Sequence, residues 1–223
     1  MPSYSGVFTL QAQMQAIAAG TWTGIPPTVI GQVFGGGFYA GQIGVSGVAT
    51  HYLVVGPVSS AQSTLQYKNA NTATSGADSV IDGPQNTADM VADGNSTVYP
   101  AAHFCNDLST GGQTDWYMPA KNELEVCYFN LKPTTESNNT TYGINANAIP
   151  ARASNYTAGD PAQTSAANFK DTGTEDFSAA TYSASTEGSA TQNWAQRFTT
   201  GYGYSVRDKD ASTLVRAIRR VAV

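Results

Sequence analysis

Two short helices, each with one apolar face and with strand-like sequence on either side of the pair, constrain the fold of this chain most. The first is predicted to begin at Pro100, a residue that suits the first helical position, and to end at Gly111 and Gly112. The second follows the segment TDWYMP and ends at Pro133. The apolar faces comprise Ala101, Phe104, Cys105 and Leu108 in the first helix and Leu124, Cys127, Tyr128 and Leu131 in the second.

Strand-like sequence precedes and follows these helices. Residues 31–57 contain β-branched and aromatic residues between glycine turns, which predicts a β-hairpin or meander. The run Gly35-Gly36-Gly37 lacks the spacing of a phosphate-binding loop and precedes a strand, so we expect a bulge or tight turn there. From Tyr182 onward the pattern predicts an antiparallel sheet, closed by one two-sided strand over TLVRAIRRVAV. The fold class is therefore α+β, with two helices packed on twisted antiparallel sheets.

Two polar segments connect these elements. Residues 59–94 are expected to form a connector, and its DGPQNT stretch carries strong turn chemistry. Residues 134–168 are rich in Ser, Thr, Asn and Gly without periodicity, which predicts a long loop region. The apolar side chains scattered along it, Tyr142, Ile144, Ile149, Tyr156 and Phe169, indicate that the loop is partly packed on the body.

The N-terminal segment has a pattern of its own. Apolar residues at Val7, Leu10, Met14 and Ile17 recur at helical spacing and predict a short helix that is too short to stand alone in water. We expect it to pack on the body, on a neighbouring copy or on another component of an assembly. The predicted organisation is an assembly segment over residues 1–30 and one domain over residues 31–223, with its core motifs in residues 100–223.

Composition excludes several classes of function. Charged residues make up only 12% of the chain, about half the usual share, and the net charge is −5 with no basic run. Nucleic acid is therefore not an expected partner. No stretch is long and apolar enough for a membrane span, and no export signal is visible, so neither membrane insertion nor export is expected. A cytoplasmically made chain with a neutral, polar surface is what we expect of a virion component.

The cysteines, histidines and carboxylates do not form recognisable catalytic motifs. Cys105 and Cys127 lie on the apolar faces of the two helices, which favours buried thiols over a disulfide. His51 and His103 have no acidic neighbour of motif type, and Glu123 and Glu125 diverge because they are two apart on a helix. The loop cluster of Asp171, Glu175 and Asp176 lacks the calcium-loop pattern and is expected to be solvated. Catalytic residues, a metal and a cofactor are all predicted to be absent.

A family resemblance enters with the run AAHFCNDLSTGGQTDWYMPAKNELEVCYFNL, followed by YSASTE, NWAQRF and VRAIRR. These segments resemble the Lcl C-terminal domain family, adhesin-type domains with a C-type-lectin-like fold, over about residues 100–223. With FGGGFYAGQI, YLVVGP and DGPQNT added, the chain also looks like bacteriophage tail-fibre and tail-associated proteins. Tyr117 and Met118 replace the usual Arg and Leu of the family, Ala120 replaces a capping Ser or Thr, and Ser183 replaces a Trp.

The resemblance implies a set of framework residues. These are Asp115, Trp116, Pro119, Glu187, Trp194, Arg216 and Arg219. Arg216 and Arg219 are expected to pair with Glu187 or Asp115. The calcium-binding tripeptides of sugar-binding C-type lectins do not occur, and no cysteine follows Cys127, which excludes the formylglycine-generating oxidases of a related fold.

With catalysis and calcium-dependent sugar binding not expected, we expect the chain to recognise sugars or protein epitopes by surface complementarity. The expected contact residues are Tyr182, Gln192, Asn193, Tyr202, Tyr204 and Asp208. The predicted function is a tail-fibre or tail-tip protein that binds a host cell-surface receptor, glycan or protein, as a homotrimer held to other virion proteins through residues 1–30. The alternative is a structural virion subunit, such as a decoration, baseplate or fibre-adaptor protein, without a receptor of its own.

Overall fold

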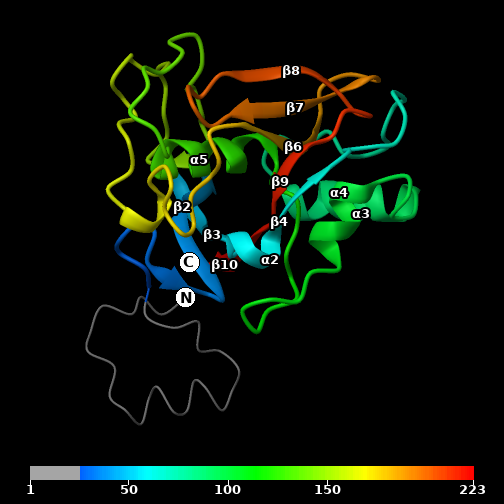
Figure 1. Cartoon of the computed structure of the whole chain (residues 1–223), viewed down its shortest axis with the longest axis horizontal. Helices are drawn as coiled ribbons and strands as arrows, with labels where there is room; N and C mark the ends of the chain where they lie inside the picture. The colour runs from blue at the N-terminus through cyan, green and yellow to red at the C-terminus, as the bar shows by residue number, and fades with distance from the viewer. Residues whose placement is uncertain (1–25) are drawn as a thin grey trace.

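A computed structural model describes residues 26–223 of the chain, apart from the side chains of residues 204–206. The fold is mixed α+β, with few helices and two curled, mainly antiparallel sheets (Figure 1). The first sheet contains β1 (Val33–Phe34), β2 (Gly37–Val45), β3 (Val48–Val55), β5 (Ala148–Ile149) and β10 (Ile218–Ala222). The second contains β4 (Gln62–Leu65), β6 (Thr181–Glu187), β7 (Gln192–Arg197), β8 (Gly203–Asp208) and β9 (Thr213–Arg216). The helices are α2 (Val58–Ala61), α3 (Gly83–Asp93), α4 (Pro100–Asn106), α5 (Lys121–Leu131) and the 3-10 turn η1 (Ala167–Phe169). The helix predicted at Val7–Ile17 lies outside the described residues.

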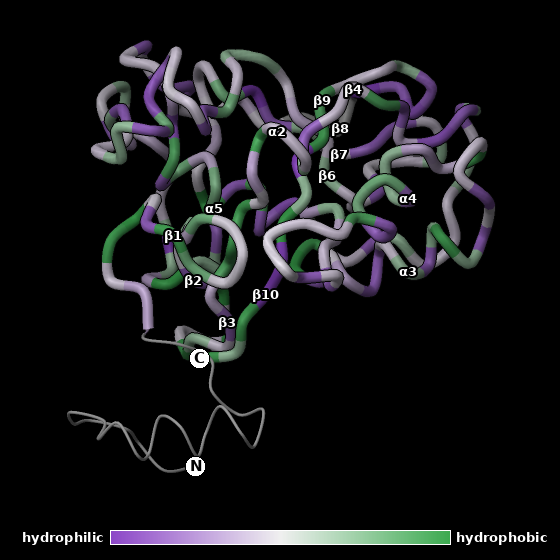
Figure 2. Tube along the Cα trace, turned by 60° about the horizontal axis from the view of Figure 1, so that its bottom comes forward, coloured by the Kyte–Doolittle hydropathy of each residue, from purple (hydrophilic) through white to green (hydrophobic). Residues whose placement is uncertain are grey.

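The predicted N-terminal hairpin is confirmed as β2 and β3. Ser46 and Gly47 form its turn, both with positive φ, at 52° and 77°, as tight two-residue hairpin turns require. Gly35 and Gly36 also have positive φ and make the tight turn between β1 and β2 that the glycine run predicted. β10 is the last strand of this sheet and pairs antiparallel with β3, so the C-terminus lies beside β3 (Figures 1 and 2).

The C-terminal strand prediction was wrong in one respect, because TLVRAIRRVAV is two strands in two sheets. β9 pairs with β4 and β6 in the second sheet, whereas β10 pairs with β3 in the first. Ala217 lies at the break, where its N–H donates to Ala61 O and its C=O accepts from Gly56 N–H. The sequence continues to alternate through the break, so alternation alone does not reveal the change of sheet.

The two predicted helices are confirmed as α4 and α5, although α4 ends at Asn106, before the predicted stop at Gly111 and Gly112. The connector was expected to be polar turns but contains α2, β4 and a longer helix, α3, that we did not predict. In α3, Asp82 accepts a hydrogen bond from Gln85 N–H and Pro84 stands in the first turn. An Asp followed by Gly-Pro is turn chemistry, but the same residues cap and start a helix. α3 packs beside α4 on the flank opposite β1 and β2 (Figures 1 and 2).

The two cysteines are free and fully buried, which confirms the prediction of buried thiols. They lie in different apolar clusters. Cys127 belongs to the cluster between α5 and the sheets, whereas Cys105 belongs to the one beneath α3 and α4. Burial raises the pKa of both thiols.

The long loop of residues 134–168 is irregular apart from β5 and the start of η1, and hydrogen bonds tie it down at its base. The buried Lys132 ammonium donates to Asn138 Oδ1 at 2.7 Å and to Pro161 O at 3.3 Å. Asn138 in turn donates to Thr157 O and to Pro161 O. These bonds join residues near the two ends of the loop, and the loop lies over α5 (Figure 1). Residues 134–168 are called the loop wall below.

Candidate recognition pocket

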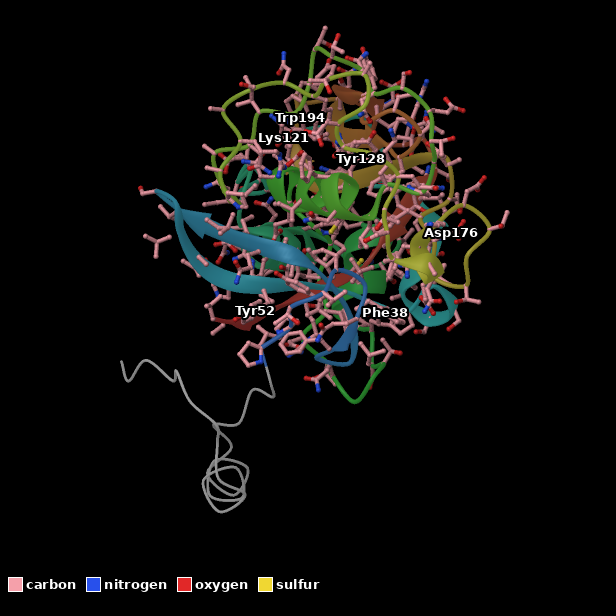
Figure 3. The ribbon with its side chains drawn as sticks, turned by 90° about the vertical axis from the view of Figure 1, so that its left-hand side faces the viewer. Phe38, Tyr52, Lys121, Tyr128, Asp176 and Trp194 are labelled. Carbon is pink, nitrogen blue, oxygen red and sulfur yellow. The ribbon has the colours of Figure 1, made fainter. Side chains whose placement is uncertain are left out.

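A cavity of about 220 Å³ opens where the long loop meets the N-terminal half of α5 and the second sheet. Helix α5 contributes Lys121 and Glu125, the loop contributes Tyr142 and Tyr156, and β7 contributes Trp194 and Gln196. Lys121 and Trp194 lie together at this end of the molecule, beyond Tyr128 (Figure 3). The pocket therefore combines aromatic walls with a few polar groups, which is the usual make-up of a ligand site.

The floor of the pocket is a buried carboxylate, Glu125. It accepts hydrogen bonds from the Arg152 guanidinium, from Asn145 Nδ2 and from the Tyr156 hydroxyl. The guanidinium also packs over the Phe129 ring, 4.0 Å from its centroid. Burial raises the pKa of Glu125 and outweighs the attraction of Arg152. This network fixes the loop to α5, and its charges compensate each other, as buried charges must.

Aromatic side chains make the walls. Tyr142 from the loop packs edge-to-face against Tyr202, with ring centroids 5.0 Å apart. Gly203 leaves room beside them, since a Cβ there would lie 3.3 Å from the Tyr142 ring. On the other side, the Lys121 ammonium sits 3.9 Å from the centroid of the Trp194 ring, a close cation–π contact.

Two of the six residues predicted to contact a ligand are fully buried, so the prediction is wrong for them. Tyr182 is 0% exposed, and its hydroxyl donates to Gln62 Oε1 within the core. Asn193 is also 0% exposed and donates to Trp194 O. Strand β6 is buried on both faces in its central part, so its alternating pattern does not mark an outer face. Neither side chain reaches a ligand directly.

The other four expected contact residues are spread over the second sheet. Gln192 and the exposed Asp208 face each other across β7 and β8 at 3.3 Å, outside the pocket lining. Tyr202 lies behind Tyr142, next to the pocket. The side chain of Tyr204 is outside the described part of the chain. The structure therefore brings only Tyr202 of these described side chains close to the cavity.

The expected framework residues have more varied roles than the resemblance implied. Trp116 is buried and donates to Thr110 O and Gln113 O, and buried Pro119 accepts from Ser185 N–H. Trp194 is only half-buried and lines the pocket, so it is a candidate ligand contact as well as a framework residue.

The predicted ion pairs need one correction. Arg219 pairs with Asp115 at 2.6 Å, as predicted. Arg216, expected to pair with Glu187 or Asp115, instead pairs with Glu175 at 2.9 Å, whereas Glu187 pairs with the buried Lys209 at 2.6 Å. The loop that carries Glu175 is therefore a structural contact and not the solvated acidic loop that we expected.

The described histidines lie away from this pocket, and the two glutamates of α5 have different partners. His51 contacts Thr50 Oγ1 and His103 contacts Gly94 O, and neither histidine lines the cavity. Glu123 and Glu125 occupy separate networks, as their spacing predicted, with Glu123 paired to Arg220 at 2.7 Å. Within residues 26–223, no three His, Cys, Asp or Glu side chains gather as metal ligands. The polar and aromatic groups of this lining are suited to non-covalent contact with a ligand.

A second hollow, of about 300 Å³, lies beside Asp115, Trp116 and Arg220. The charges around it are already paired, Asp115 with Arg219 and Arg220 with Glu123. It therefore offers a ligand fewer unsatisfied groups than the first pocket.

No protein-family model matches the sequence, and no curated protein is significantly similar to it. Within the described part of the chain, no helix is long and apolar enough to cross a membrane.

Sequence reasoning missed most of the pocket. Lys121, Glu125 and Gln196 gave no signal, because their neighbours in the pocket come from distant parts of the sequence. The aromatic residues of the long loop were the available clue. Of these, Phe169 and Tyr156 are buried and Tyr142 is half-buried at the pocket, whereas Ile144 is 61% exposed. An aromatic side chain that packs within a long loop indicates that this loop lies against the rest of the domain and can border a pocket.

Proposed function

We propose that this protein is a bacteriophage virion component that attaches the particle to a host cell-surface receptor by non-covalent recognition, and that it is not an enzyme. The observation that carries the proposal is the pocket itself. It combines the rigid loop wall, the aromatic residues Tyr142 and Trp194 and the compensated carboxylate Glu125, and it includes no nucleophile with a base beside it. A site with this make-up recognises a ligand without transforming it.

A C-type-lectin-like arrangement is the fold we propose. Support comes from the helices α4 and α5 packed on curled antiparallel sheets, from the pairing of β10 with β3, and from the long loop inserted between α5 and β6. In such a fold the binding residues lie on a loop, and the helices and sheets serve to position that loop. The proposed attachment role likewise needs no calcium.

The virion location and the assembly follow from composition and from the demands of attachment. A surface with 12% charged residues suits recognition through hydroxyls, amides and aromatic rings. Single pockets of this size bind weakly, and linked copies raise the overall affinity without new contacts. We therefore propose a homotrimer held to other virion proteins through residues 1–30.

The test is attachment to the cells on which the particle grows. Purified protein should bind these cells and block infection, and Trp194→Ala and Tyr142→Ala should each reduce both effects at least about tenfold, as loss of an aromatic anchor does. Val33→Ala, at a side chain that is 77% exposed in the other sheet, is the control and should change nothing. Thermal unfolding of each variant separates loss of the pocket from loss of the fold.

Two results would contradict the proposal. Wild-type protein that neither binds cells nor blocks infection would favour the structural-subunit alternative. Density for this chain at a capsid or baseplate joint, away from every distal tip, would do the same.

A further inference from the structure

The Lys121 ammonium differs from the other buried and half-buried cations of residues 26–223. It is half-buried against the Trp194 ring, yet it has no carboxylate within 4.0 Å and donates no hydrogen bond within the described chain. Every other basic side chain in residues 26–223 that is not exposed has a polar partner. These side chains are Lys68, Lys132, Arg152, Arg207, Lys209, Arg216, Arg219 and Arg220. Among residues 26–223, Lys121 is thus the one partly buried cation left without such a partner.

The charged side chains around the pocket leave it with a net positive charge. The Glu125 carboxylate attracts the Lys121 charge, but Arg152 already pairs with that carboxylate. Lys121 and Arg152 against Glu125 leave a net charge of +1 at this pocket, in a protein whose net charge is −5. A charge partly removed from water acts more strongly on a ligand than one on the open surface. The pocket therefore attracts an anionic group to Lys121.

The rest of the lining indicates the kind of molecule that carries the anion. A volume of about 220 Å³ holds about seven water molecules at ~30 Å³ each and is smaller than the sites of drug-sized ligands. The amides of Asn122, Asn155 and Gln196 and the ring of Tyr142 border this space. Amides and aromatic faces suit hydroxyl groups and the apolar side of a sugar ring. An acidic peptide would need a groove or a free strand edge instead.

We infer that the pocket binds a single sugar ring that carries a carboxylate, with the carboxylate at Lys121. This inference rests on the proposed recognition function and names its ligand class. If this is so, loss of the Lys121 charge weakens the binding of acidic sugars but not that of neutral ones. Loss of the aromatic wall weakens the binding of both.

The experiment titrates the full-length protein with matched pairs of sugars. The methyl glycosides of glucuronic and galacturonic acid are compared with those of glucose and galactose, which differ only at C6, and N-acetylglutamate represents an acidic peptide. The readout is the indole N–H resonance of Trp194, assigned with Trp194→Phe. The variants are Lys121→Gln and, as a matched control, Lys170→Gln at an exposed lysine.

We expect at least one uronide to bind at least about fivefold more tightly than its neutral partner, as a charge-assisted hydrogen bond provides. This preference should disappear in Lys121→Gln, persist in Lys170→Gln and weaken with added salt. Binding of no uronide, equal binding of acid and neutral sugars, an unchanged preference in Lys121→Gln, or equal binding of N-acetylglutamate would each overturn the inference. The proposed function fails separately, if Trp194→Ala and Tyr142→Ala leave attachment to host cells unchanged.

Discussion

Arg216→Met tests how the two sheets are held together, because Arg216 lies at the end of β9, next to the break between the sheets. The side chain is 1% exposed. Its guanidinium donates to the carbonyls of Gly56, Glu175 and Asp176, each at 3.0 Å, and to the Glu175 carboxylate at 2.9 Å. Burial lowers the pKa of Arg216 to about 10. Methionine fills similar space but leaves three carbonyls and a carboxylate without this donor.

The expected loss of stability is about 3–5 kcal/mol, the usual cost of removing one partner from a buried ion pair. That is a large part of the 5–15 kcal/mol that typically stabilises a domain. The Glu175 carboxylate keeps its bond from Val58 N–H at 2.8 Å, so the loop does not detach entirely. Urea unfolding followed by tryptophan fluorescence should show the midpoint falling by more than about 1 M.

Arg219→Met is the matched control. Arg219 pairs with Asp115, whose side chain is 57% exposed, and donates to Gly35 O at 2.8 Å. An ion pair with such an exposed partner contributes little, so we expect a loss of about 1 kcal/mol. Equal losses in the two variants, or a loss below about 1 kcal/mol for Arg216→Met, would refute the assignment of Arg216 as the buried link between the sheets.

Three further predictions concern the core. Cys105 and Cys127 should not react with a thiol reagent such as Ellman's reagent until the chain is unfolded in denaturant; fast reaction in the native state would contradict their burial. Gly201→Ala should cost about 2 kcal/mol in thermal unfolding, because its φ is +69° and a Cβ would lie 2.7 Å from the Tyr156 ring. Burial raises the pKa of Tyr67 and Tyr156, so their stabilising effect is complete below pH ~10 and is lost at higher pH. Tyrosine absorbance should therefore rise together with alkaline unfolding, and full ionisation in the folded state would contradict this.

Local patterns predicted the elements whose signals lie within a few residues. The apolar spacing gave α4 and α5, and the glycine turns gave the hairpin of β2 and β3. The same approach missed α3, because Asp82 and Pro84 have identical preferences in a turn and at a helix start. It also joined β9 and β10, because the alternation of apolar residues does not record which sheet a strand enters.

The pocket was less predictable than the fold, because its contacts join distant residues. Glu125 and Arg152 are 27 residues apart, and Lys121 meets Trp194 across two elements. Tyr182 was predicted as a contact residue because it is an aromatic residue of the C-terminal third that lies near polar residues and predicted turns. Its burial follows from the packing of α5 and the aromatic cluster on that face, which no local pattern encodes. The sequence thus predicted a partly packed long loop, but not which residues this loop brings together at the pocket.

The most direct test of attachment through this pocket is hydrogen exchange of the protein with and without surface polysaccharide extracted from host cells. The account predicts that bound polysaccharide slows exchange at residues 141–144, in the loop wall, and at residues 194–196, in β7, while the turn between β2 and β3 is unaffected. Protection confined to that turn or to α3, or no protection at saturating polysaccharide, would contradict the claim that this pocket is the recognition site.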